Sequence, residues 1–414
     1  MQGSTSKLRN VYGDHSIHKF DDITMSDHIT DGSMIDANTH FVAFSYKTSV
    51  AGQVAVIDAK DFHRLPPNPP LLSGHTAPIL DIKFSPFRTN LLATGSEDTS
   101  VRLWEIAQGG IANGYTEQQK YTGHSKKVTY LSFSPVVEEL IATSSYDNTV
   151  QVWNILNGST YCNVNLGDVI YSLDWNHDSS LLSASTKKKL IEVIDPRTGQ
   201  VTLKTTTHEG NKPQKHKFLN DDFILSVGFS RSNERAIKLF DLRNISEPVQ
   251  NLVIDNSSGV ITPFYDSDLG LVYLVGKGEP VIKVYDFSNE KIKYATEYRS
   301  SQSLRSFAFF PKRAMNYNQL EIGRFARAYG TNLDYVSFYY PKKHEGYDES
   351  VYPECFAGEP ALALEEWLKG ENRKPIKKKI TSLENSWSAS AQTFEKKVEE
   401  VHHKPEDLDK AKVS

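Results

Sequence analysis

The stretch GHTAPILDIKFSPFRTNLLATGSEDTSVRLWE, residues 74–105, decides the fold of this 414-residue chain. A related stretch, GHSKKVTYLSFSPVVEELIATSSYDNTVQVWN, occupies residues 123–154, so the period of the repeat is 49 residues (123 − 74). In each copy a histidine precedes an aspartate by 23 residues, and that aspartate precedes a tryptophan by 6 residues. Two separate spacings are therefore kept in both copies.

These spacings are typical of the WD repeat, in which each copy forms a four-stranded blade of a β-propeller. The key residues are His75, Thr94, Asp98 and Trp104 in the first copy and His124, Thr143, Asp147 and Trp153 in the second. A histidine, a hydroxyl and a carboxylate could be imagined as a catalytic set. Two equivalent sets in adjacent repeats instead favour a buried hydrogen-bonded chain, because each polar group would cost about 1–3 kcal/mol if it were left unpaired.

Further segments resemble the third strand of these repeats, an apolar alternation that ends in a bulky residue. The bulky residues of the whole series are Ile57, Trp104, Trp153, Ile194, Phe240, Tyr285 and Tyr339. Successive members are separated by 47, 49, 41, 46, 45 and 54 residues. The sequence therefore predicts an all-β fold, a seven-bladed WD-repeat β-propeller, although only two blades carry the complete motif. In the repeat after these two, Lys188 replaces the turn aspartate, so we expect that blade to lack the buried chain.

The ends of the propeller must be joined, because an open sheet edge invites pairing with other chains. We expect Lys7–Gly13 to add the outer strand of the seventh blade. The predicted domains are the propeller over 1–345, a C-terminal extension packed on it over 346–378, and a linker or unique region over 379–414. The last region is predicted to be partly helical or disordered, since its apolar repeat covers only about two heptads, too few for a coiled coil.

The extension contains one predicted helix and one basic run. The segment Pro360–Leu368 reads as a short helix that begins at its proline and ends before Gly370. Its apolar residues Leu362, Leu364 and Trp367 are expected to pack on the propeller. The basic run that follows is a candidate for binding anionic lipid, and its members are Arg373, Lys374, Lys377, Lys378 and Lys379.

Composition excludes several classes of function. The formal net charge is −4, which argues against a dedicated nucleic-acid-binding protein. Two cysteines in 414 residues indicate a cytosolic chain without disulfides. We find no metal-ligand spacing, no phosphate-binding loop and no nucleophile with a supporting base. The sequence thus predicts a protein that is not an enzyme and needs no cofactor or metal.

Basic residues recur near the predicted connections between strands. The candidates for a binding surface are Lys126, Lys127, Lys188, Arg231, Arg235 and Lys283. Connections on one rim of a propeller converge in space, so charges that are dispersed in the sequence can form one patch. Such a patch would suit an acidic protein surface or an anionic lipid head group.

Beyond the repeats, the chain resembles the coronins, the actin-binding WD-repeat family. The matching strings are RNVYG (9–13), IDPRTG (194–199), HEG (208–210), GFSR (228–231), ER (234–235), DNSSGV (255–260), PFYD (263–266), VYLVGKG (272–278), PKR (311–313), EIGRF (321–325) and LEEWL (364–368). The resemblance covers roughly residues 7–370 and is specific, because other WD-repeat proteins lack these strings.

The resemblance implies a propeller closed by its N-terminal strand, with an extension along its underside. It implies binding to the sides of actin filaments, roles in motility and endocytosis, and a place in the cytoplasm at the actin cytoskeleton and cell cortex. The six basic residues above then become candidates to face actin. The alternative is a phosphoinositide-binding, membrane-surface scaffold without direct actin binding.

Two features depart from the family pattern. Coronins usually end in a coiled coil that oligomerises them and helps to contact the actin-related-protein nucleation complex. We see no such coiled coil in this sequence, so oligomerisation and that contact would need a segment not seen here. Many coronins also place a basic residue for filament binding just after an acidic pair, whereas Asp21-Asp22-Ile23 is followed here by Thr24.

Overall fold

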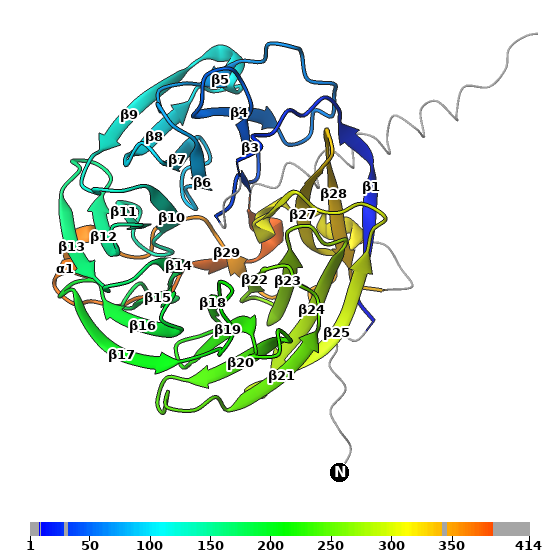
Figure 1. Ribbon diagram of the computed structural model, residues 1–414. Coiled ribbons are helices and arrows are strands. Elements are labelled where there is room, and N and C mark those ends of the chain that lie inside the picture. Colours follow the sequence, from blue (N-terminus) through cyan, green and yellow to red (C-terminus); the bar gives the residue numbers. More distant parts are fainter. Residues whose placement is uncertain (1–7, 9, 29–31, 342–345, 384–414) are drawn as a thin grey trace, which may run out of the picture.

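In the computed structural model, four-stranded antiparallel sheets are arranged as blades around a central axis (Figure 1). The structure describes residues 8, 10–28, 32–341 and 346–383, and there are seven such sheets within these ranges. The first strands of neighbouring sheets contact one another around the axis. The predicted seven-bladed propeller is therefore confirmed.

Each blade is built from strands that follow one another in the chain. Blades 1 to 3 are β2 (Ile35–Ala37), β3 (Phe41–Tyr46), β4 (Gln53–Asp58) and β5 (Leu71–Leu72); β6 (Ile79–Phe84), β7 (Leu91–Ser96), β8 (Val101–Ile106) and β9 (Tyr115–Tyr121); and β10 (Val128–Phe133), β11 (Leu140–Ser145), β12 (Thr149–Asn154) and β13 (Thr160–Asn165). Blades 4 and 5 are β14 (Ile170–Trp175), β15 (Leu182–Thr186), β16 (Leu190–Asp195) and β17 (Gln200–Thr206); and β18 (Lys215–Phe218), β19 (Phe223–Phe229), β20 (Arg235–Asp241) and β21 (Gln250–Asp255). Blade 6 is β22 (Ile261–Asp266), β23 (Leu271–Gly276), β24 (Val281–Ser288) and β25 (Lys291–Arg299).

The seventh blade combines both ends of the propeller sequence. It consists of β26 (Ser306–Phe309), β27 (Glu321–Tyr329), β28 (Asn332–Tyr339) and the N-terminal strand β1 (Tyr12–Phe20). Strand β1 pairs antiparallel with β28, with Tyr12 opposite Tyr339 and Phe20 opposite Leu333. Closure by an N-terminal strand is thus confirmed, but the strand begins later than predicted. Val11 is buried and its N–H donates to the Leu8 carbonyl, so a turn comes before the strand.

The apolar core consists of seven clusters within the described residues, and each cluster is shared by two neighbouring blades. Between blades 2 and 3, for example, Leu103 and Tyr121 pack with Leu131 and Trp153. The two residues Cys162 and Cys355 are free thiols buried in two of these clusters. No helix within the described residues is long and apolar enough to cross a membrane.

The antiparallel strand order defines two faces of the ring. The connection from the second to the third strand and the connection to the next blade leave from the same face, which we call the upper face. It includes the connections at 122–127, 187–189 and 230–234. The connections from first to second and from third to fourth strand, such as 134–139 and 219–222, form the lower face.

The C-terminal extension packs on the lower face. It contains β29 (Cys355–Phe356), α1 (Leu364–Leu368) and β30 (Lys377–Lys378), and β29 pairs with β30. Figure 1 shows the extension, in orange, running from the region of β13 and β14 to the centre of the ring, where β29 is seen. Leu362, Leu364 and Trp367 join the cluster between blades 3 and 4, as the sequence predicted.

The helix is shorter than the sequence predicted. It begins at Leu364 and not at Pro360, because the N–H groups of Ala361 and Leu362 donate to the Val136 carbonyl of blade 3. Those two bonds keep the preceding segment extended. The predicted end is confirmed, since Gly370 adopts a φ of 96° directly after the last turn. The predicted amphipathic segment beyond Leu383 lies outside the described residues.

Candidate functional site: the upper face and the central cavity

The two complete repeats build the same buried hydrogen-bonded chain. In blade 2, His75 Nδ1 lies 2.8 Å from Asp98 Oδ2, and His75 Nε2 lies 2.8 Å from Thr94 Oγ1. The Trp104 indole N–H donates to the same hydroxyl at 2.8 Å. In blade 3 the equivalent distances are 3.0, 2.7 and 2.9 Å, for the pairs His124–Asp147, His124–Thr143 and Trp153–Thr143. Both imidazole nitrogens are engaged in each chain, so neither histidine is available as a base.

Burial and hydrogen bonding determine the protonation of the aspartate and the histidine in these hydrogen-bonded chains. Burial raises the pKa of Asp98, but hydrogen bonds from His75 and Ser100 outweigh burial and hold that pKa below its ordinary value. Burial lowers the pKa of His124 against the attraction of Asp147. A neutral imidazole beside an ionised carboxylate donates from Nδ1, which leaves Nε2 to accept from the threonine hydroxyl.

Blade 4 contains a different polar network. Lys188 occupies the position of the turn aspartate, as the sequence indicates, and the WD-type chain is not formed there. Instead His216, on β18 of the next blade, lies 2.6 Å from Ser172 Oγ through Nδ1 and 2.7 Å from Ser183 Oγ through Nε2. Burial lowers the pKa of His216 to about 4, so the ring is neutral at pH 7. This network joins blades 4 and 5 and was not predicted from the sequence.

Four of the predicted basic residues lie in connections of the upper face. Lys126 and Lys127 lie between β9 and β10, Lys188 between β15 and β16, and Arg231 between β19 and β20. The first of these three connections leads into blade 3, and the other two lie within blades 4 and 5, which follow it around the ring (Figure 1). Residues that are dispersed over 106 positions (231 − 126 + 1) of sequence therefore share one face of adjoining blades.

These four side chains differ in their partners. Lys126 is exposed, and the Arg231 side chain is 86% exposed beside Glu209 at 2.9 Å. Lys127 lies 3.2 Å from a carboxylate oxygen of Glu97. Lys188 donates to a backbone carbonyl, that of Gly167, at 3.1 Å. An exposed ion pair such as Arg231–Glu209 contributes about 0–1 kcal/mol to stability. Lys126 and Arg231 can therefore contact a binding partner at little cost in stability.

Arg235 and Lys283 lie in a different environment. Arg235 is 1% exposed, and its guanidinium donates to both carboxylate oxygens of Asp255 at 2.6 and 2.7 Å. It also donates to Glu279 and to the Gly259 carbonyl, which ties blade 5 to blade 6. Lys283 lies 3.0 Å from Asp255. Arg235 offers no accessible surface, so the sequence-based assignment of this residue to a partner contact is corrected to a bridge between blades.

Each member of the basic run in the extension has an acidic partner. The pairs are Arg373 with Glu366 at 2.9 Å and Glu371 at 2.8 Å, Lys374 with Asp221 at 3.0 Å, Lys377 with Asp268 at 2.8 Å, Lys378 with Glu359 at 2.5 Å and Lys379 with Glu349 at 2.5 Å. Asp221 and Asp268 belong to lower-face connections of blades 5 and 6. Lys374 and Lys377 therefore attach the extension to the propeller, whereas the other three residues pair within the extension. Lipid binding by the run stays a prediction.

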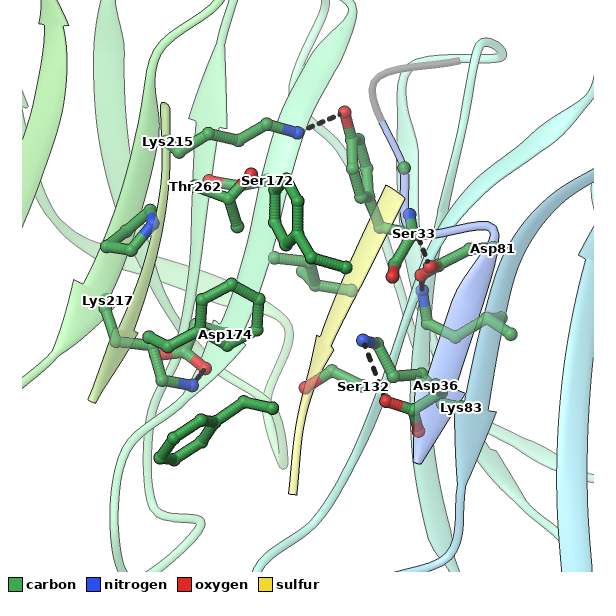
Figure 2. Close-up of a pocket in the computed structure, with 18 of the residues that line it drawn as sticks. Ser33, Asp36, Asp81, Lys83, Ser132, Ser172, Asp174, Lys215, Lys217 and Thr262 are labelled. Atoms are coloured by element: carbon green, nitrogen blue, oxygen red, sulfur yellow. Dashed lines mark hydrogen bonds and ion pairs between the residues drawn. The ribbon is translucent and has the colours of Figure 1, made fainter. Parts of the chain in front are cut away.

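A cavity of about 410 Å³ lies at the centre of the ring and is lined by inner strands of the blades. Its charged lining residues are Asp36, Asp81, Lys83, Asp174, Lys215, Lys217 and Lys277. Figure 2 shows Lys83 directed toward Asp36 and Lys217 directed toward Asp174 from opposite sides of the cavity. A cavity lined by these residues was not predicted from the sequence, although Lys215 and Lys217 belong to the basic residues that recur near strand connections. Their signal is the presence of charges inside otherwise apolar strands, as in ILDIKF at 79–84.

Comparisons with known proteins place these features in context. The model described as "WD domain, G-beta repeat" matches residues 69–105 and 115–154, and one described as a type of WD40 repeat matches 333–375. A domain model of unknown function matches residues 2–64. The first model thus matches blades 2 and 3, which carry the complete motif, and the second covers β28 and most of the extension.

Several curated proteins are similar along almost the whole chain. Human Coronin-2B is 40% identical over 399 residues, which cover 94% of this chain and 82% of that protein. Coronin-A of Dictyostelium discoideum is 37% identical over 407 residues, which cover 97% of this chain and 89% of that protein. The crystal structure of the WD40 domain of Toxoplasma gondii coronin has a TM-score of 0.87 and 30% sequence identity, with 90% of this chain and 97% of that one covered.

Proposed function

The chain belongs to the coronin family of WD-repeat proteins, and we propose that it binds the sides of actin filaments as a non-enzymatic interaction module. The observation that carries the proposal is the extent of the family likeness, which includes the propeller and its extension together. Through this binding the protein would organise filaments at the cell cortex and support motility and endocytosis. The actin-related-protein nucleation complex and phosphoinositide membranes are further proposed partners.

The upper face of blades 3 to 5 is the surface that we assign to actin. Lys126, Lys188 and Arg231 are exposed basic residues of this surface, and Lys127 lies beside Lys126 in the same connection. The chain as a whole carries a net charge of −4, so attraction to an acidic filament must come from a local patch such as this one. Lys283 lies at the edge of the patch and is held by Asp255.

A co-sedimentation assay with filamentous actin tests the proposal. We expect the protein to pellet with filaments at low salt and to be released as salt rises, because exposed charges are screened beyond about 8–10 Å at ordinary ionic strength. Absence of pelleting at low salt, for a protein whose thermal unfolding is intact, would show that the proposal is wrong.

Charge-reversal variants test the assigned surface. The double substitution Lys126→Glu and Arg231→Glu is expected to weaken pelleting by about tenfold or more, since each reversal replaces an attraction with a repulsion. The matched control is Lys369→Glu, which changes an exposed lysine of the extension, on the lower face. The melting temperature should be unchanged in both proteins. Equal pelleting of the two variants would place the actin contact elsewhere.

Flotation with liposomes separates actin binding from the alternative of a membrane-surface scaffold. Because the residues of the basic run are held by acidic partners, we expect phosphoinositide-containing vesicles to float a smaller fraction of the protein than actin filaments pellet in the same buffer. Strong flotation without pelleting would favour the scaffold.

A further inference from the structure

We propose that the central cavity is a binding site for a small phosphate-bearing molecule with a flat apolar body, whose anion lies between the ammonium groups of Lys83 and Lys217. This site is distinct from the actin surface proposed above, because it is made by the inner strands and not by the connections of the upper face. The proposal does not depend on whether the protein binds actin.

The two ammonium groups have hydrogen bonds left to donate. Lys83 Nζ lies 3.9 Å from Asp36 Oδ1, which is beyond hydrogen-bonding distance, and the Lys83 side chain remains 31% exposed to the cavity. Lys217 donates to one oxygen of Asp174, and its side chain is 36% exposed. An ammonium carries three N–H donors, so each lysine can bind an oxyanion without breaking a contact that the structure shows.

The aspartates of the cavity accept hydrogen bonds from backbone N–H groups of the surrounding strands. Asp36 Oδ2 accepts from the Phe84 N–H at 2.8 Å, and Asp174 Oδ2 accepts from the Phe218 N–H at 2.9 Å. Both oxygens of the third carboxylate, Asp81, accept backbone N–H groups of the two adjoining blades, at 3.0 and 2.8 Å. These carboxylates join first strands to each other, and their bound N–H groups offset part of the negative charge. A cation would have to compete with those bonds, whereas an anion uses the free donors of the lysines.

Two further lysines add positive charge at the rim. Lys215 Nζ donates to the Tyr130 hydroxyl and to the Tyr171 carbonyl, both at 2.7 Å. Lys277 Nζ donates to the Gly32 carbonyl at 2.7 Å. The lining thus contains four lysines and three aspartates, so the field in the cavity favours an anion.

The wall suits an organic molecule better than a free ion. Phenylalanine rings line the cavity beside the two lysines, at Phe84, Phe133, Phe264, Phe307 and Phe309. A volume of about 410 Å³ lies within the range of small-molecule sites. An aromatic or other flat body can pack on these rings while its phosphate contacts the ammonium groups.

The extension lies near the lower end of the cavity (Figure 1). Pro86 lines the cavity, and its carbonyl accepts from the guanidinium of Arg313 at 2.9 Å. Arg313 also donates to the Ala357 carbonyl of the extension at 3.3 Å, and Phe356 contacts Phe87 with ring centroids 5.9 Å apart. The molecule would therefore enter from the upper face.

Isothermal titration calorimetry with phenyl phosphate tests the site on the full chain. We expect saturable binding, and at least about tenfold weaker binding by Lys83→Met, which removes the charge at similar length. Ser132→Phe, which fills the cavity without a change of charge, should weaken binding to the same degree. This variant provides the test of the site if Lys83→Met folds poorly. Lys369→Met, on the lower face and outside the cavity, is the matched control and should bind as the unaltered protein does.

Two further ligands, inorganic phosphate and benzyl alcohol, test the anion site and the apolar subsite separately. Inorganic phosphate should bind more weakly than phenyl phosphate, and benzyl alcohol, which lacks the charge, should not bind detectably. No binding of phenyl phosphate overturns the proposal, as does binding that is unchanged in Lys83→Met and Ser132→Phe. Equal binding of inorganic phosphate would exclude the apolar subsite, and equal binding of benzyl alcohol would exclude the anion site.

Discussion

At the scale of single residues, one threonine hydroxyl provides hydrogen bonds to two other members of the buried hydrogen-bonded chain of a WD repeat. Thr143 donates to His124 and accepts from Trp153 at 2.7 and 2.9 Å, so its loss leaves two buried groups without a partner. We expect Thr143→Ala to lower the free energy of unfolding by about 2–4 kcal/mol, which urea denaturation can measure. The cost arises because unsatisfied buried groups are expensive, and not because one hydrogen bond is strong.

Blade 5 supplies the matched control for this prediction. Ser226 occupies the equivalent place on β19, but Phe240 stands where blades 2 and 3 have tryptophan, and the Ser226 hydroxyl has no hydrogen-bond partner among the described residues. We therefore expect Ser226→Ala to change stability by less than about 0.5 kcal/mol. Similar losses for Thr143→Ala and Ser226→Ala would contradict this account of the chain.

At the scale of elements, the short helix α1 acts as an anchor for the extension. Trp367 is fully buried between blades 3 and 4, and its indole N–H donates to the Ser179 carbonyl at 2.9 Å. We expect Trp367→Ala to lower the free energy of unfolding by about 3–5 kcal/mol. Leu368→Ala, one residue later on the exposed side, should change it by less than about 0.5 kcal/mol. Comparable melting temperatures for the two variants would show that the helix does not anchor the extension.

At the scale of the whole molecule, buried histidines make stability depend on pH. Burial lowers the pKa of His208 and of His216 to about 4, below the ordinary value of 6.5. Between these values the unfolded chain binds more protons than the folded one, so both residues reduce stability as pH falls from 6.5 toward 4. Burial has the opposite effect at Asp36, whose pKa it raises to about 6, and this carboxyl opposes the loss.

The contribution of one histidine is isolated by substitution. In His216→Gln we expect the fall in unfolding free energy between pH 6.5 and 4 to be shallower than in the unaltered protein by up to about 1.4 kcal/mol per pH unit. Urea denaturation across this range measures it. The control is His15→Gln, because His15 has an exposed side chain on the outer strand. An identical pH slope in His216→Gln would mean that this imidazole is not buried as a neutral group.

The sequence predicted the architecture well because the repeat spacing is a local property. The series of bulky residues from Ile57 to Tyr339 located the third strand of each blade, even in blades that lack the complete motif. It could not show which charged residues become buried, since this depends on contacts between blades. Arg235 reads like Arg231 in the sequence, yet only one of them meets Asp255 and Glu279. The meeting of the central lysines in one cavity was not predicted, because converging strands, and not neighbours in the sequence, bring them together.

The pairing of β1 with β28 has a consequence for synthesis of the protein. Lys19 donates to Asn332 across these strands, 313 positions further along the chain. Strand β1 leaves the ribosome before the other strands of the propeller, and it must therefore remain without its partner until β28 has been made. During that interval both edges are open to pairing with other nascent chains. We expect the final docking of β1 to occur after translation of the propeller, as the event that makes the circle continuous.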